Sequence, residues 1–236
     1  MSPYFKIENG VLIFKRRYET IRIEAWGKNA LRVRATQNHS FTAEDWALSE
    51  PVSETANAYM ESRPTDYGFE MKIGVIENGT IRAEMTEGGR IRFLNSKGEI
   101  LLEEHYNAMG YYVAFNGEDD WINGHQYGRK YRTAGGDNYK IRMLFKADDS
   151  EMIFGMGQYQ QKTLNLKGTT LELRQINTQA SVPFYVSNKG YGFLMNNPAI
   201  GQVSFGTNMT EWNFESTKQI DYWVTAGDTP AQIEEQ

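Results

Sequence analysis

A chain of 236 residues with 40% hydrophobic and 13% aromatic residues can bury a full hydrophobic core, and β-sandwiches of this length commonly form one domain. The formal net charge is -5 and no cysteine is present, which excludes disulfides, thiolate metal sites and a thiol nucleophile. No stretch of the sequence concentrates Lys and Arg together with aromatic residues, so nucleic acid is not expected as a partner.

The start of the chain and its hydrophobicity predict where the protein is found. Residues 1–6 lack the charged region and apolar run of a signal peptide. No stretch approaches the apolar length of a membrane span, so no membrane partner is expected. We expect a cytoplasmic protein, and a periplasmic or secreted one if further residues precede Met1.

The first half of the sequence predicts antiparallel strands, because short segments alternate apolar and polar residues between turn signals. Strands are expected at residues 5–7, 11–14, 18–26 and 31–34, followed by a meander across 71–103. Asn9-Gly10 supplies the positive φ angles of a two-residue hairpin turn between the first two.

Two stretches lack this alternation and are predicted to be irregular. The first, residues 40–66, holds scattered Pro, Ser, Thr and Glu. The second, residues 116–138, combines glycines with aromatic residues such as Trp121, His125 and Tyr127. Such loops often reach towards ligands, and the alternative is that these aromatics pack over a sheet.

The second half of the sequence returns to the strand pattern. Strands are expected at residues 141–145, 152–154, 170–173, 182–186, 191–195, 202–205, 211–214 and 220–224. So many short segments favour an all-β, two-layer antiparallel β-sandwich, since each sheet must bury its apolar face on another layer. We expect a single domain over residues 1–236.

Residues 228–236 carry a helix signal. Thr229 and Gln232 form a capping-box pattern, and Pro230 suits the first helical position because its missing N–H is not needed there. The sequence stops at Gln236 after about one turn, which is too short to be stable alone. We therefore expect the chain to be part of a longer protein.

Other candidate motifs are weak. Gly155 and Gly157 lack the Lys-Ser/Thr pair of a phosphate loop and are interpreted as a turn between strands. The pairs Glu103-Glu104, Asp119-Asp120 and Asp148-Asp149 point to opposite faces of an extended strand and are interpreted as solvated surface charge. The three histidines have no second ligand at metal-binding spacing, so neither a metal nor another cofactor is expected.

The carboxyl-terminal part of the sequence resembles a known enzyme family. The motifs are Phe154-Gly155-Met156-Gly157-Gln158-Tyr159, Leu164-Asn165-Leu166-Lys167-Gly168, Val182-Pro183-Phe184-Tyr185-Val186-Ser187 and Lys189-Gly190-Tyr191-Gly192-Phe193. Their order and spacing are similar to the amino-terminal domain of glycoside hydrolase family 31, specifically over residues 151–236 and diffusely before them. Gln158-Tyr159, where many members have Glu-His, is more similar to the α-xylosidase branch.

The resemblance implies a galactose-mutarotase-like sandwich packed on a catalytic (β/α)8 barrel of the same chain. That family hydrolyses α-glycosidic bonds with retention, using two aspartates that both lie in the barrel. No catalytic residue is therefore expected in this chain, and the isolated chain is expected to be inactive. The substrate implied for the full enzyme is an α-linked xylosyl or glucosyl oligosaccharide.

The resemblance also implies a substrate-binding loop at residues 174–181, because one loop of this domain usually contributes to the rim of the substrate pocket. Gln175, Asn177 and Thr178 are the candidate substrate-binding residues, since their uncharged polar groups can exchange hydrogen bonds with sugar hydroxyls. By residue type alone, Asn177 and Thr178 are equally turn formers.

Two other functions remain alternatives. An independent carbohydrate-binding module is compatible with the same architecture, because a fold does not fix a function. An aldose epimerase of related fold would need a positioned acid and base, commonly a His with a carboxylate, on a concave sheet face. The sequence shows no such arrangement.

Overall fold

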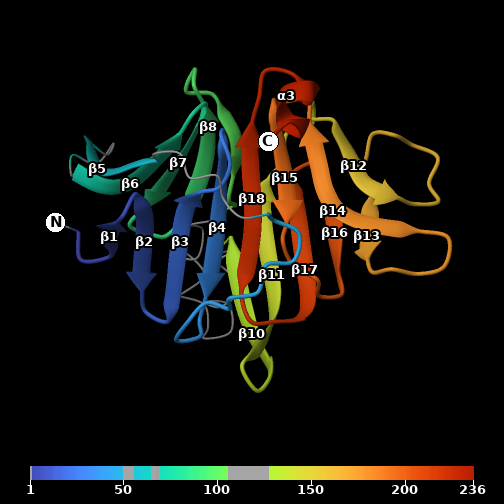
Figure 1. The fold of residues 1–236 in the computed structure, drawn as a ribbon, viewed down its shortest axis with the longest axis horizontal. Helices are drawn as coiled ribbons and strands as arrows, with labels where there is room; N and C mark the ends of the chain where they lie inside the picture. The colour runs from blue at the N-terminus through green and yellow to red at the C-terminus, as the bar shows by residue number, and fades with distance from the viewer. Residues whose placement is uncertain (1, 50–55, 65–67, 69, 106–127) are drawn as a thin grey trace, which may run out of the picture.

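The computed structural model describes residues 2–49, 56–64, 68, 70–105 and 128–236. Their regular structure is antiparallel strand apart from one short helix. The strands form two layers that face each other across the hydrophobic core (Figure 1). This confirms the all-β, two-layer antiparallel β-sandwich predicted from the alternation of apolar and polar residues.

One layer is an eight-stranded sheet, sheet A, in the order β1-β2-β3-β4-β18-β15-β14-β12. Its strands are β1 (Phe5–Glu8), β2 (Val11–Arg16), β3 (Glu19–Ala25), β4 (Ala30–Thr36), β12 (Ile153–Gln158), β14 (Ala180–Ser187), β15 (Tyr191–Met195) and β18 (Ile220–Ala226). β4 pairs with β18 from Ala30 and Thr225 to Ala35 and Ile220. This pairing joins the two ends of the sequence in one sheet.

The other layer holds two five-stranded sheets, B and C. Sheet B has the order β5 (Asn57–Pro64), β6 (Glu70–Asn78), β7 (Ile81–Thr86), β8 (Ile91–Asn95) and β9 (Ile100–Glu103). Sheet C has the order β10 (Arg129–Gly135), β11 (Asn138–Lys146), β17 (Met209–Thr217), β16 (Gly201–Phe205) and β13 (Thr170–Leu173). An antiparallel bridge between Glu104 and Phe145 links the two sheets.

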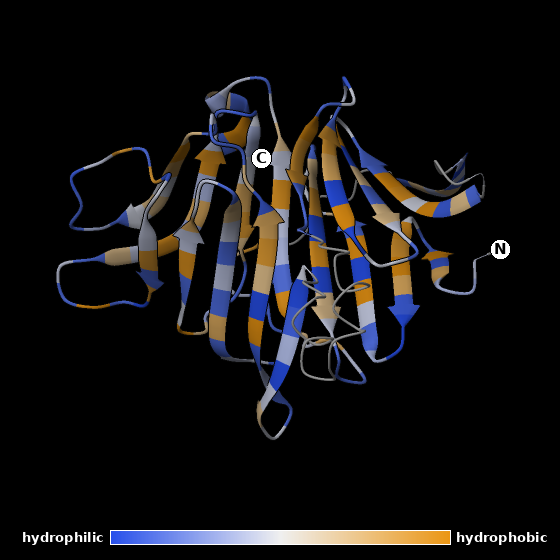
Figure 2. Cartoon of the chain, turned by 180° about the vertical axis from the view of Figure 1, so that it is seen from behind, coloured by the Kyte–Doolittle hydropathy of each residue, from blue (hydrophilic) through white to orange (hydrophobic). Residues whose placement is uncertain are grey.

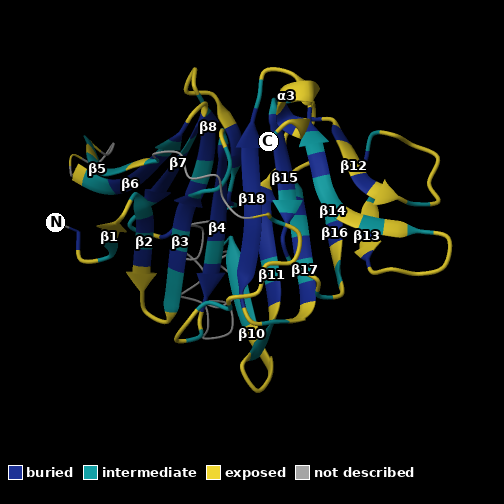
Figure 3. Cartoon of the chain, in the orientation of Figure 1, coloured by how far each residue is buried: buried dark blue, intermediate teal, exposed yellow. Residues whose placement is uncertain are grey.

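The core lies between the layers, where the apolar side chains of alternate strand positions meet. Figure 2 shows this alternation along the strands, and Figure 3 shows the buried residues in the middle of both layers. Phe193 of β15 stacks on Trp212 of β17 at a ring-centroid distance of 5.3 Å and on Tyr222 at 5.2 Å. All three are buried, and full burial of one large apolar side chain contributes roughly 1.5–3 kcal/mol.

Two stretches predicted to be irregular contain strands, which corrects the prediction. β5 lies within residues 40–66 and pairs with β6 along its whole length. β10 occupies the end of the stretch 116–138. Both are edge strands rich in charged side chains, so the apolar alternation that predicts a strand is weak in them. Trp121, His125 and Tyr127 lie outside the described residues.

A short helix, α3 (Pro230–Glu234), follows β18. The Thr229 hydroxyl accepts the Gln232 N–H at 3.3 Å, and the Gln232 side chain accepts the Asp228 N–H at 2.8 Å. Ile233 is buried against β15, where a Cβ on Gly192 would lie only 2.6 Å from it. Within the described part of the chain, no helix is long and apolar enough to cross a membrane.

Candidate functional site

The segment predicted to form a pocket rim crosses between the two layers. It leaves β13 of sheet C after Leu173 and enters β14 of sheet A at Ala180, and it projects beyond the strands at the right of Figure 1. An antiparallel bridge between Ile176 and Gln179 closes it as a tight turn. Residues 174–179, called the rim loop from here on, therefore place their tip at residues 177 and 178.

Thr178 adopts a φ of 71° at this tip. The left-handed conformation is rare for a β-branched residue, and strain of this kind costs about 1–3 kcal/mol. Such strain persists only where surrounding contacts hold it, and Gln160 provides one by donating from Nε2 to Thr178 Oγ1 at 2.9 Å. The rim loop is thus tied to the preceding connection between β12 and β13.

Gln175 braces the rim loop from inside. Its Nε2 donates to the Ser181 carbonyl at 2.8 Å, and its Oε1 accepts the Ser181 N–H at 3.1 Å. Both polar groups of the Gln175 amide are therefore hydrogen-bonded to the backbone of Ser181, as the C=O and N–H of a neighbouring strand would be.

Tyr159 supports the base of the same loop. Its hydroxyl lies 3.0 Å from the Glu172 carbonyl oxygen and 2.7 Å from Ser181 Oγ. Burial raises the pKa of the Tyr159 hydroxyl, which keeps it protonated as a hydrogen-bond donor. Tyr159 was expected only as part of a family motif, and this bracing role was not predicted.

The structure brings the three predicted site residues together in one loop but gives them different partners. The side chain of Gln175 is hydrogen-bonded to Ser181, and the Thr178 hydroxyl accepts a hydrogen bond from Gln160. Asn177 is exposed, and its side chain makes no hydrogen bond to any described residue. Of the three, Asn177 is the one with an uncommitted amide. Contact of any of them with substrate stays a prediction.

Gly155 and Gly157 of β12 lie beside the base of the rim loop, and their position corrects the expectation that they form a turn. Gly155 and Gly157 are not in a turn between strands but within β12, where the register with β14 shifts between them. They and Met156 all have positive φ, so this stretch is a β-bulge. A Cβ on Gly157 would lie 2.2 Å from the Ala180 carbonyl oxygen, at the start of β14.

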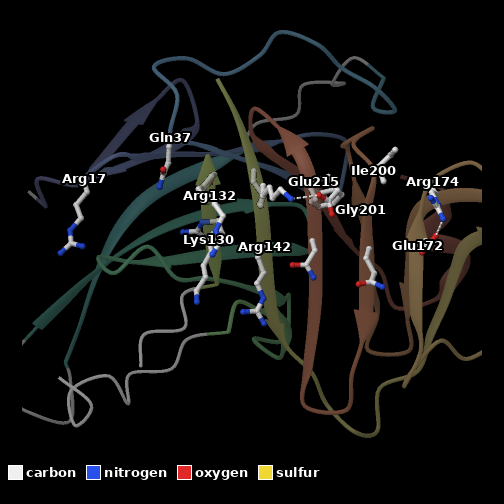
Figure 4. Close-up of a pocket in the computed structure, with 17 residues that line it drawn as sticks. Arg17, Gln37, Lys130, Arg132, Arg142, Glu172, Arg174, Ile200, Gly201 and Glu215 are labelled. Atoms are coloured by element: carbon white, nitrogen blue, oxygen red, sulfur yellow. Dashed lines mark hydrogen bonds and ion pairs between the residues drawn. The ribbon is translucent and has the colours of Figure 1, made fainter. Parts of the chain in front are cut away.

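A groove of about 1340 Å³ lies over the outer face of sheet C (Figure 4). Its two carboxylates are ion-paired, Glu172 with Arg174 at 2.7 Å and Glu215 with Lys140 at 3.0 Å. No histidine is among the described residues that line it. The His and carboxylate pair that an aldose epimerase would need is therefore not present in this described lining.

Glu104 corrects the interpretation of the acidic pairs as surface charge. Its side chain is 2% exposed and ion-paired with Arg129, which also donates to Glu19 at 2.8 Å. Burial raises the pKa of the Glu104 carboxyl, and the nearby Arg129 charge opposes that rise. The cluster connects β3, the end of β9 and β10, so its role is structural. Asp119-Asp120 lie outside the described residues. Among the described residues, the His, Asp and Glu side chains form no group of three suited to a metal.

The two-layer fold, with its rim loop crossing between the layers, matches one enzyme domain family. A model for the glycosyl hydrolase 31 amino-terminal, galactose mutarotase-like domain matches residues 20–203. The chain belongs to this family, which confirms both the resemblance seen in the sequence and the galactose-mutarotase-like class of the fold.

Individual relatives point to the same family. The chain is 40% identical over 222 residues to an uncharacterized family 31 glucosidase from Pseudescherichia vulneris, covering 92% of this chain and 40% of that protein. It is 27% identical to α-xylosidase A from Aspergillus niger, over 95% of this chain and 30% of that protein. A crystal structure of a family 31 α-xylosidase from a soil metagenome, complexed with xylose, is 39% identical with a TM-score of 0.83, over 98% of this chain and 33% of that chain.

The chain therefore spans less than half the length of the relatives it matches. It corresponds to the amino-terminal domain of family 31 glycosidases, a family that includes α-xylosidases.

Proposed function

We propose that this chain is the non-catalytic amino-terminal domain of a retaining α-glycosidase that hydrolyses α-linked xylosyl or glucosyl residues. In this proposal both catalytic aspartates belong to a barrel elsewhere in the same protein, and the rim loop of this chain completes the substrate pocket. The family membership and the similarity to an α-xylosidase that binds xylose support the substrate class.

The observation that carries the pocket role is the contrast within the rim loop. Its backbone is braced by Gln175 and Tyr159, yet Asn177 at its tip has no hydrogen-bond partner among the described residues. An amide held on a rigid loop is suited to a sugar hydroxyl, because both donate and accept and little conformational entropy is lost on binding. This arrangement supports Asn177 as the strongest candidate for substrate contact.

Exposed apolar side chains near the rim loop support the proposed barrel partner. Leu164 is 87% exposed, and Ile176 and Val182 are about half exposed. Leu164 and Ile176 lie on the two connections that the Gln160–Thr178 hydrogen bond holds together, and Val182 lies near the start of β14. A cluster of this kind at one end of a domain is suited to burial against another part of the protein.

The test is hydrolysis by the intact protein of 4-nitrophenyl α-xyloside and 4-nitrophenyl α-glucoside, with the anomer of the released sugar followed by NMR. We expect hydrolysis of at least one substrate with the α-anomer formed first, and no activity from residues 1–236 alone. Failure to hydrolyse either substrate, release of the β-anomer, or activity of the isolated chain would contradict the proposal.

The alternative of an independent binding module makes a separate prediction. It requires the isolated chain to bind neutral xylose-containing oligosaccharides by itself. We expect calorimetry to detect no such binding, since the rim loop supplies only part of a pocket.

A further inference from the structure

The groove on sheet C is built from a row of polar side chains that crosses every strand of the sheet (Figure 4). The row is in direct cross-strand register, and its members are Lys130, Arg142, Asn213, Gln202 and Glu172. Because neighbouring strands lie about 4.8 Å apart, the row is roughly 19 Å long. That length suits a short oligomer better than a single small molecule.

The charge along this groove is uneven. At the β10 end lie Lys130, Arg132 and, from the turn between β2 and β3, Arg17. None of the three forms an ion pair with a described residue. The remaining basic side chains of the groove are neutralised, as Arg142 is by Glu211 at 2.6 Å. Positive charge that no described residue compensates is thus gathered at one end of a groove in a chain whose net charge is -5.

The rest of the groove offers no further unpaired charge among the described residues, because Glu172 and Glu215 are ion-paired with Arg174 and Lys140. Asn213 and Gln202 present amides in the middle of the row. A polymer with a negative charge on every unit would find unpaired cations at one end of the groove only. The favoured ligand carries its charge at one end and hydroxyl groups along its length.

We propose that this groove binds an oligosaccharide of neutral sugars that carries one uronic acid. Its carboxylate is bound by Lys130 and Arg132, and its hydroxyls exchange hydrogen bonds with Asn213 and Gln202. The far end of the groove contains Arg174, the residue that begins the rim loop, so a bound oligosaccharide runs towards that loop. The binding does not depend on the proposed enzymatic function.

The probe is a xylotriose bearing one glucuronic acid, titrated into the intact protein by calorimetry at low salt, with neutral xylotetraose as the matched ligand. We expect the acidic ligand to bind and the neutral one to bind at least about tenfold more weakly, because its missing carboxylate leaves the charged hydrogen bonds unformed. The double variant Lys130→Gln/Arg132→Gln should weaken binding of the acidic ligand by about tenfold or more.

The control variant is Lys6→Gln/Lys72→Gln, which removes two positive charges at exposed positions outside the groove. It should leave the affinity for the acidic ligand unchanged, and thermal unfolding should show that both double variants fold. Absence of binding, equal loss in the control variant, or equal affinity for xylotetraose would overturn the proposal. So would tighter binding of inorganic polyphosphate through the same two residues, which would identify a phosphate polymer as the ligand.

Discussion

Arg32 of β4 donates from Nε and Nη2 to the two carboxylate oxygens of Asp221 on the neighbouring strand β18, at 2.9 and 2.6 Å, and both side chains are at least 98% buried. The Arg32 guanidinium also lies 4.2 Å from the centre of the Trp26 ring and pairs with Asp45. The Arg32–Asp221 pair thus joins β4 and β18, the strands through which the first and last parts of the sequence meet in one sheet. Asp45 lies on the connection that follows β4.

Substitution of one member of this pair should destabilise the fold strongly. Asp221→Asn leaves the Arg32 charge buried without its main partner, and loss of one partner of a buried ion pair costs about 3–5 kcal/mol. The apolar double variant Arg32→Met/Asp221→Leu should recover much of this loss, because it removes both charges. Urea unfolding measures the free energy of unfolding of both variants, and a double variant no more stable than Asp221→Asn would contradict this account.

The stability of the chain should fall at acid pH partly through Glu84. Burial favours a higher pKa for this carboxyl, but hydrogen bonds from Arg63 and Arg92 and their charges outweigh it and lower the pKa to about 2. The ordinary value is about 4.3. A lowered pKa in the folded state stabilises the fold above pH 4.3, and this stabilisation is lost as the pH falls to about 2.

Glu84→Gln tests this directly. Its free energy of unfolding should fall less steeply than that of the parent between pH 4.3 and 2, by up to about 1.4 kcal/mol per pH unit. Glu234→Gln, which removes an exposed carboxylate that forms no ion pair with a described residue, is the control and should keep the parent slope. Identical slopes for Glu84→Gln and the parent would show that the arginines around Glu84 do not stabilise its charge.

Gly157→Ala should be far more destabilising than a comparable glycine substitution. The new Cβ would lie 2.2 Å from the Ala180 carbonyl oxygen, at a φ of 89°. Gly98→Ala is the matched control, because Gly98 has a φ of 79° and nothing within 4 Å of the added carbon. We expect a loss of about 1 kcal/mol for Gly98→Ala and about 3 kcal/mol or more for Gly157→Ala. Equal losses in thermal unfolding would exclude the bulge contact as a constraint.

The sequence predicted most of the strands and the pairing within the hairpins and the meander, because these features are local. Asn9-Gly10 lies between two strands in the structure as it does in the prediction, since the turn alone sets their register. Edge strands β5 and β10 escaped prediction because charged side chains interrupt their apolar alternation, and some of these ion-pair with other strands, as Arg63 does with Glu84.

Contacts between distant residues could not be predicted. Glu104 and Arg129 meet across 25 positions, and no local pattern marks either as buried. The cations of the groove were missed for the same reason. Arg17 comes from the turn between β2 and β3, whereas Lys130 and Arg132 come from alternate positions of β10. The rim loop was found only through the family resemblance, and the distinction between the occupied Gln175 and the uncommitted Asn177 required side-chain positions.

The most direct test of the central claim is initial-rate kinetics of Asn177→Ala in the intact protein, on the α-xyloside or α-glucoside that the parent hydrolyses. Loss of one hydrogen bond to the substrate should lower kcat/KM by about two- to twelvefold, corresponding to about 0.5–1.5 kcal/mol, with no change in Tm. Asn208→Ala, at another exposed asparagine in the turn between β16 and β17, should match the parent. An Asn177→Ala enzyme with kinetics indistinguishable from the parent would contradict the role of the rim loop in the sugar pocket.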